Sequence, residues 1–248
     1  MQRLNNPRLL RSAQGFLQAR NYAAQIVLAL DVDTIEEAKR LVDNLYPKIG
    51  IFKVGSHLFT AYGPKVIEML HERGAQVFLD LKYFDIPNTV AKAVAAAVRL
   101  KVKMLTLHIS GGKEMLEDAV ASVKEQAKIS KVSRPLLIGV TVLTSKSAKP
   151  GEVLALAKTG INCGLDGLVC SAHEAAILRN KIKNNFIIVT PGIRANNSIK
   201  DDQKRVATVS QAVKAGSNFL VIGRPILKAA SPQAAAEELL KDLHSIRD

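Results

Sequence analysis

The chain has 248 residues and a formal net charge of +13, a length that suits one large α/β domain. It has no Trp and only two cysteines, Cys163 and Cys170, which excludes a disulfide framework and offers few aromatic side chains for stacking on bases. No apolar run is long enough to span a bilayer, so we expect a cytoplasmic protein that does not enter membranes.

Residues 1–24 differ in composition from the rest of the chain. They contain four arginines and no acidic residue, and they lack the apolar core of a signal peptide. A transit-like leader and an extension outside the fold are the two alternatives. We treat the segment as a basic N-terminal extension and place the domain at residues 25–248.

From residue 25 onward, short apolar runs alternate with amphipathic segments. The runs are continuous and rich in Leu and β-branched residues, as in strands buried on both faces of a parallel sheet. There are eight, at 26–30, 51–54, 77–81, 104–107, 137–142, 167–169, 187–189 and 219–222.

The segments between these runs carry helix signals. Thr34 and Glu37 have the spacing of a capping box, and Pro64 and Pro87 suit first helical turns. Eight strand–helix units in order predict an α/β fold of the (β/α)8 type, a TIM barrel of eight parallel strands. An open doubly wound sheet is the competing architecture.

In such a barrel, functional side chains gather at the carboxyl ends of the strands. Here those ends carry polar or turn residues: Asp31, Lys53, Asp80, Lys82, His108, Thr141, Thr144, Cys170-Ser171, Thr190–Arg194 and Gly223-Arg224. One mouth therefore collects two Asp/Lys pairs and two arginines.

Asp80-Leu81-Lys82-Tyr83-Phe84-Asp85 is the most informative stretch. Side chains alternate along a strand, so we expect Asp80 and Lys82 to point the same way, one pleat apart, with Asp85 just beyond. Two carboxylates would hold that lysine charged and in place, able to protonate a carbanion. A surface ion network at a strand end is the alternative.

Asp31 and Lys53 extend this pattern to the two preceding strands. Alternating charges around the mouth would compensate one another, and a lysine at the end of an apolar strand is costly unless paired. A purely structural charge ring is the alternative to a catalytic one.

The loops after the last two strands predict a phosphate site. Gly223-Arg224 opens the final helix in our interpretation, where backbone N–H groups bind anions, and Arg194 adds charge at the same corner. The polar segment 195–205 is either a passive loop or a lid from which Gln203 reaches the ligand. We interpret His108 as structural rather than catalytic, and no residue spacing predicts a metal site.

Several motifs, in order from about residue 25 to the end, resemble the bacterial type of the orotidine 5′-phosphate decarboxylase family. They are Leu28–Asp31, Lys53–Gly55, Phe78–Thr89, Val140–Ser145, Cys163–Gly167, Val189–Arg194 and Val221–Pro225. The resemblance implies conversion of orotidine 5′-monophosphate to UMP and CO2, the last step of de novo pyrimidine synthesis. It also implies that neither a metal nor an organic cofactor is needed.

The resemblance further implies residue roles. Lys82 would protonate C6 of the pyrimidine, with Asp80 against the departing carboxylate. Asp31 and Lys53 would bind ribose hydroxyls, and Thr144 would contact the pyrimidine. The phosphate would be held by Arg194, Gln203, Gly223 and Arg224. Asp85 and Thr89 would reach the neighbouring subunit's site in a homodimer.

Two other functions stay open at this point. A related barrel could act on a sugar phosphate with magnesium, because the Asp-x-Lys-x-x-Asp core is shared. The basic excess alone would suit a nucleic-acid-binding protein, but the charges are scattered and no known binding motif is present, so we expect no nucleic-acid partner.

Overall fold

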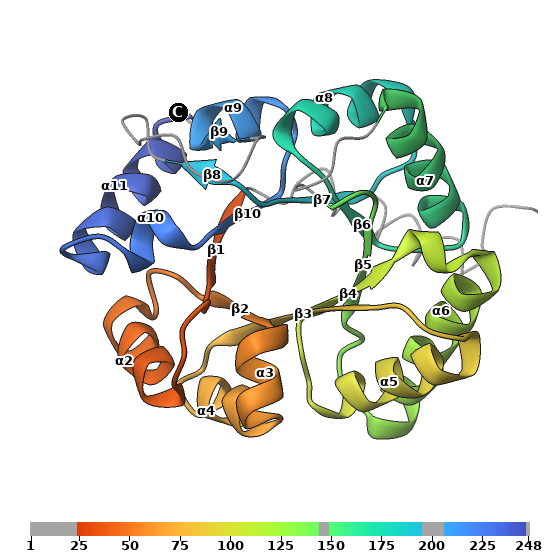
Figure 1. Ribbon diagram of the computed structural model, residues 1–248, viewed down its shortest axis with the longest axis horizontal. Coiled ribbons are helices and arrows are strands. Elements are labelled where there is room, and N and C mark those ends of the chain that lie inside the picture. Colours follow the sequence, from red (N-terminus) through yellow and green to blue (C-terminus); the bar gives the residue numbers. More distant parts are fainter. Residues whose placement is uncertain (1–23, 144–148, 195–205, 247–248) are drawn as a thin grey trace, which may run out of the picture.

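The computed structural model describes residues 24–143, 149–194 and 206–246. Eight parallel strands close into a barrel surrounded by helices (Figure 1). The strands are β1 (Gln25–Ala29), β2 (Ile51–Gly55), β3 (Gln76–Tyr83), β4 (Met104–His108), β5 (Leu136–Val140), β6 (Gly167–Val169), β7 (Ile187–Thr190) and β10 (Phe219–Ile222).

Closure of the sheet decides between the two architectures expected from sequence. β1 pairs in parallel with β2 on one side and with β10 on the other. The (β/α)8 barrel is therefore confirmed, and the open doubly wound sheet is wrong. Each of the eight apolar runs overlaps one barrel strand, although the runs at 26–30 and 137–142 extend one and two residues past the strand ends.

Helices cover the outside of the barrel (Figure 1). They are α2 (Ile35–Leu45), α3 (Ser56–Tyr62), α4 (Lys65–His71), α5 (Pro87–Arg99), α6 (Lys113–Ser130), α7 (Pro150–Asn162), α8 (Ala172–Lys181), α9 (Val209–Lys214), α10 (Arg224–Leu227) and α11 (Pro232–His244). A short 3-10 turn, η1 (Ile109–Gly111), follows β4. A small sheet of β8 (Ile193–Arg194) and β9 (Ala207–Thr208) lies outside the barrel. No helix in the described ranges is long and apolar enough to cross a membrane.

Helix starts follow the local sequence signals. Thr34 is the N-cap of α2, and its hydroxyl accepts a hydrogen bond from the Glu37 backbone N–H at 3.1 Å. Pro87 is the first residue of α5, where its missing N–H costs nothing. Pro64 is the N-cap of α4, one residue earlier than the first-turn position we expected.

The barrel has its own core, separate from the layer between strands and helices. Its buried residues come from seven of the eight strands, lie two apart where a strand supplies two, and fill the lumen: Val27, Ala29, Ile51, Phe78, Met104, Ile138, Ile187, Val189, Phe219 and Val221. Two residues further toward the carboxyl ends, this alternation brings polar side chains inward: Asp31, Lys53, Asp80 and Thr106. A polar layer thus rests on an apolar plug.

Candidate active site

Four charged side chains form a chain of alternating sign across the mouth of the barrel. Lys53 Nζ lies 3.0 Å from Asp31 Oδ1 and 3.7 Å from Asp80 Oδ2. Lys82 Nζ donates to the same Asp80 oxygen at 2.9 Å. The structure thus brings together the four strand-end charges singled out from the sequence.

In this row of four charges, the two middle side chains are shielded from solvent and the two at its ends are more exposed. The side chains of Lys53 and Asp80 are 11% and 13% exposed, against 35% for Lys82 and 62% for Asp31. A ligand entering the mouth therefore meets Lys82 and Asp31 first.

Asp80 is held ionised by its neighbours. Burial by itself would raise the pKa of this carboxyl, but the charges of Lys53 and Lys82 and hydrogen bonds from Lys82 and Thr106 outweigh it and lower the pKa. The carboxylate is therefore fixed in both position and charge, which suits an electrostatic role.

The backbone that presents Lys82 departs from a regular strand. Leu79 pairs with Leu105 of β4, but the next pairing joins Tyr83 to Leu107, so residues 80–82 of β3 face the single residue Thr106. Lys82 itself has φ of 52°, in the left-handed region that non-glycine residues rarely occupy. Asp80 and Lys82 do meet, as expected, but our reason was wrong: a bulge, not an undisturbed pleat, brings them together.

Thr106 is the member of this site that the sequence analysis missed. Its side chain is fully buried, and its hydroxyl donates to Asp80 Oδ1 at 2.9 Å while accepting from the Lys82 backbone N–H at 2.9 Å. The available signal was its place two residues after Met104, on the inward face of an otherwise apolar strand.

At the predicted phosphate corner, the structure describes Gly223, Arg224 and Arg194. Gly223 and Arg224 follow β10, but they are the N-cap and the first residue of the four-residue helix α10. Our prediction that they open the final helix is therefore wrong, because α11 begins only at Pro232. A Cβ on Gly223 would lie 3.5 Å from Asp31 Oδ2, which places this backbone beside the charged chain. Arg194 ends β8, and one guanidinium nitrogen donates to the Ile193 carbonyl at 3.2 Å.

Two predicted binding residues, Thr144 and Gln203, lie outside the described residues. The segment 195–205, which we considered as a lid, lies outside them as well.

Comparison with known proteins agrees with this geometry. A model of the "Orotidine 5'-phosphate decarboxylase / HUMPS family" matches residues 24–239. Two relatives named orotidine 5′-phosphate decarboxylase, from Coxiella burnetii (strain RSA 331 / Henzerling II) and Legionella pneumophila (strain Paris), are 44% and 47% identical over 230 residues. These alignments cover 88% of this chain and 96% and 99% of the relatives. The chain belongs to this family.

A solved structure supports the same assignment. The crystal structure of orotidine 5′-phosphate decarboxylase from Lactobacillus acidophilus superimposes with a TM-score of 0.77 at 34% identity, covering 89% of this chain and 99% of that one. The orotidine 5′-phosphate decarboxylase resemblance read from the motifs is thus confirmed.

In the part of the chain that the structure describes, Asp85 and Thr89 are not bonded to the four charged side chains at the barrel mouth. Both are exposed, and Asp85 Oδ1 accepts from the Ile86 backbone N–H at 2.7 Å. No hydrogen bond or ion pair within the described ranges joins either residue to the four mouth charges. Beside them, Phe84 and Ile86 are 61% and 66% exposed.

His108 and Cys170 have surroundings that suit structural roles. The ring of Phe84 lies edge-on to that of His108, with centroids 5.8 Å apart. Burial raises the pKa of the Cys170 thiol far above its usual value, so the thiol stays neutral. Over the part of the chain that is described, no three His, Cys, Asp or Glu side chains cluster as metal ligands.

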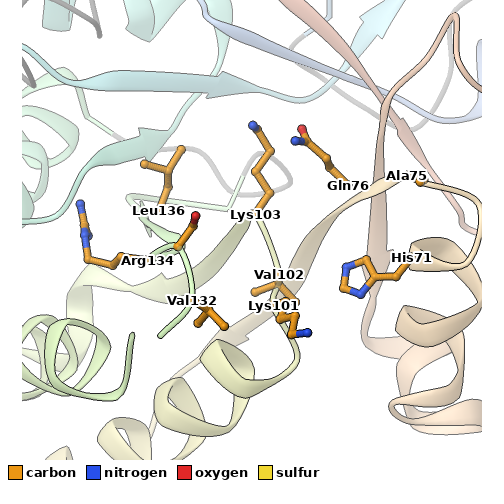
Figure 2. Close-up of a pocket in the computed structure, with 11 residues that line it drawn as sticks. His71, Ala75, Gln76, Lys101, Val102, Lys103, Val132, Arg134 and Leu136 are labelled. Atoms are coloured by element: carbon orange, nitrogen blue, oxygen red, sulfur yellow. The ribbon is translucent and has the colours of Figure 1, made fainter. Parts of the chain in front are cut away.

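A separate cavity of about 770 Å³ opens at the other end of this barrel (Figure 2). It is lined by residues at the amino ends of strands, including Gln76, Lys103 and Leu136, together with His71 and Arg134. Burial lowers the pKa of Lys103 there. Enzymes with a (β/α)8 barrel place their active sites at the carboxyl ends of the strands, so we do not assign this cavity to the active site.

Proposed function

We propose that this protein decarboxylates orotidine 5′-monophosphate to UMP and CO2, the last step of de novo pyrimidine synthesis, with Lys82 as the proton donor. The names of its relatives support the reaction. The observation that carries the residue assignment is the chain Asp31–Lys53–Asp80–Lys82, which ends in a half-exposed ammonium at the mouth.

The chemistry asks for a fixed positive charge. Breaking the bond between C6 and the carboxylate leaves an electron pair in the plane of the pyrimidine ring, where the π system cannot take it up. An ammonium held next to C6 stabilises that charge more than it stabilises the substrate, and then supplies the proton that completes UMP. Lys82 would do both, because Asp80 fixes its Nζ.

The other charged residues would orient the nucleotide. Asp80 would lie against the departing carboxylate and favour its loss, while Asp31 and Lys53 would hold the ribose hydroxyls. The exposed Asp31 carboxylate beside Gly223 supports this arrangement, since it puts a ribose site next to the phosphate corner.

Phosphate would be held by the backbone at Gly223 and by Arg194 and Arg224, with Gln203 closing from segment 195–205. Thr144 would contact the pyrimidine. The binding energy of the phosphate, far from the reacting bond, would help to close the site and desolvate the carboxylate.

We further propose that the enzyme is a cytoplasmic homodimer whose sites are shared. Asp85 and Thr89 would complete the partner's site, which would explain why, among the described residues, neither is bonded to the mouth charges of its own chain. Exposed Phe84 and Ile86 flank Asp85, and burial of such side chains against a second copy would stabilise the dimer. Residues 25–248 would form the single catalytic domain, with 1–24 outside it.

The test of the reaction is direct. Orotidine 5′-monophosphate is added to the purified protein with excess EDTA, and the orotate ultraviolet absorbance is followed. We expect rapid loss with UMP as the product. A folded dimer that leaves the absorbance unchanged would contradict the proposal.

The alternative within the same fold is a magnesium-dependent enzyme acting on a sugar phosphate. The description of the matching family names HUMPS beside the decarboxylases, so membership of the family alone does not decide between the two reactions. Turnover of a sugar phosphate that stops on addition of EDTA, together with no action on orotidine 5′-monophosphate, would favour it.

The shared site has its own test. Asp85→Asn and Lys82→Ala variants, each nearly inactive, are mixed under conditions that exchange subunits. We expect part of the activity to return, because half of the heterodimer's sites combine an intact Lys82 with an intact Asp85. No recovery, with exchange verified by tagged subunits, would contradict the sharing.

A further inference from the structure

Thr106 joins the two catalytic candidates from a neighbouring strand. We propose that Thr106 is a positioning residue: its hydroxyl holds the Asp80 carboxylate and the Lys82 backbone in the relation that the decarboxylation needs. The inference rests on the proposed function and goes beyond it, since the fully buried Thr106 would act through Asp80 and Lys82.

The Thr106 hydroxyl both donates and accepts a hydrogen bond within the site. A threonine hydroxyl has one proton to donate, and here it goes to Asp80 Oδ1 at 2.9 Å. The oxygen accepts from the Lys82 N–H at 2.9 Å. Asp80 therefore has Lys82 Nζ on one oxygen and Thr106 on the other, so its carboxylate plane is held from two sides.

The bulge explains why the Lys82 N–H needs the Thr106 hydroxyl as its acceptor. With residues 80–82 facing only Thr106, the Lys82 N–H has no carbonyl of β4 in register to accept it. A buried backbone donor without an acceptor is costly, and the threonine oxygen takes the place of the missing carbonyl. The same bond holds Lys82 in its left-handed conformation, from which its side chain turns back to Asp80.

Valine at position 106 would keep the shape of the side chain and remove both hydrogen bonds. Thr106→Val is nearly isosteric but can neither donate to Asp80 nor accept from Lys82. The carboxylate then rotates about its remaining bond to Lys82, and the 80–82 backbone relaxes. Thr106→Ser keeps both hydrogen bonds and loses only a methyl group.

The experiment compares steady-state kinetics of Thr106→Val and Thr106→Ser on orotidine 5′-monophosphate. We expect Thr106→Val to lower kcat by about tenfold or more, with KM changed far less, because the binding groups are elsewhere. Thr106→Ser should recover most of the lost kcat. A Thr106→Val enzyme with kcat within about twofold of wild type would overturn the proposal.

A second readout does not depend on turnover. Asp80 faces Lys53 and Lys82, with Asp31 beyond Lys53, and the Thr106 bond is one of the interactions that lower its pKa. In urea unfolding at a series of pH values, the free energy of unfolding of Thr106→Val should begin to fall at a higher pH than that of wild type. Thr106→Ser should show the same pH dependence as wild type. Identical acid profiles for wild type and Thr106→Val would overturn the proposal even if the wild-type protein proved to lack the proposed activity.

Controls separate positioning from general damage. Ser122→Ala removes a half-buried hydroxyl whose 2.7 Å bond to the Ala91 carbonyl joins α6 to α5, away from the mouth. It should lower stability while leaving kcat and the acid profile unchanged. If Thr106→Val does not fold, Thr106→Ala removes the same hydroxyl without adding a methyl group and decides by the same criteria.

Discussion

At the scale of residues, Asp80 is the centre of the site. Among the residues that the structure describes, it is the one carboxylate that contacts both lysines, and it is nearly buried between them. Removing it would leave two ammonium groups facing each other at the barrel mouth. Its charge would therefore serve the stability of the protein as well as the proposed reaction.

This dual role predicts a pH-dependent stability. The pKa of Asp80 is lowered in the folded protein, so its contribution is present above the unfolded value of 3.8 and is lost as the pH falls through the lower, folded value. Asp80→Asn should cost about 3 kcal/mol at pH 7. The difference in the free energy of unfolding between wild type and Asp80→Asn should become smaller below pH 3.8. Urea unfolding at several pH values measures it, and a gap independent of pH would contradict this account.

The same residues show how far the sequence predicts a site. Asp31, Lys53, Asp80 and Lys82 could be found because barrels expose strand ends, and charges at the ends of apolar strands need a reason. Thr106 was missed: its place in an apolar strand was the one signal, and its contacts with Asp80 and Lys82 depend on a bulge that the sequence pattern does not predict. The role of Asp85 was implied by family resemblance alone, since a single chain leaves it in solvent.

At the scale of elements, each barrel unit depends on how its strand passes into the next helix. Ser171 follows β6 and caps α8 with a complete capping box. Its hydroxyl donates to Glu174 Oε2 at 2.8 Å and accepts from the Glu174 backbone N–H at 3.3 Å. Both residues are buried, so these bonds are not exchanged for water.

We expect Ser171→Ala to lower the free energy of unfolding by about 1–2 kcal/mol, because it leaves a buried helix start without its partners. Thr208→Ala is the matched control: Thr208 caps α9 with the same box but is only partly buried. Chemical denaturation should show the smaller loss for Thr208→Ala. Equal losses would mean that burial of the cap does not matter here.

Strands were easier to predict than the short elements around them. Continuous apolar runs identify a buried parallel strand, and all eight were found. The four-residue α10 and the β8–β9 pair lack enough residues for any periodicity, which is why Gly223-Arg224 was assigned to the final helix. Their positions depend on tertiary contacts, such as those of β8 with β10 and of α10 with α11.

At the scale of the whole molecule, the two ends of the barrel differ in character. The carboxyl ends carry the charged chain, while the amino ends form the cavity around Lys103. Within the described residues Lys103 has no ion pair, and burial lowers its pKa. The apolar plug separates it from the mouth.

This separation predicts that Lys103→Met leaves kcat/KM within about twofold of wild type. Stability should not fall, because the substitution removes a partly desolvated charge and keeps the apolar stem. Kinetics and thermal unfolding on the same preparation measure both. A large loss of kcat/KM would show that the amino-terminal end communicates with the mouth.

The central claim is that Lys82 carries the reaction on orotidine 5′-monophosphate. The most direct measurement compares UMP formation by wild type and Lys82→Ala at equal concentration, with circular dichroism and thermal unfolding confirming that both are folded. We expect wild type to convert the substrate and the variant to lose activity by about a thousandfold or more. A folded Lys82→Ala protein that keeps a substantial part of the wild-type rate would contradict the account.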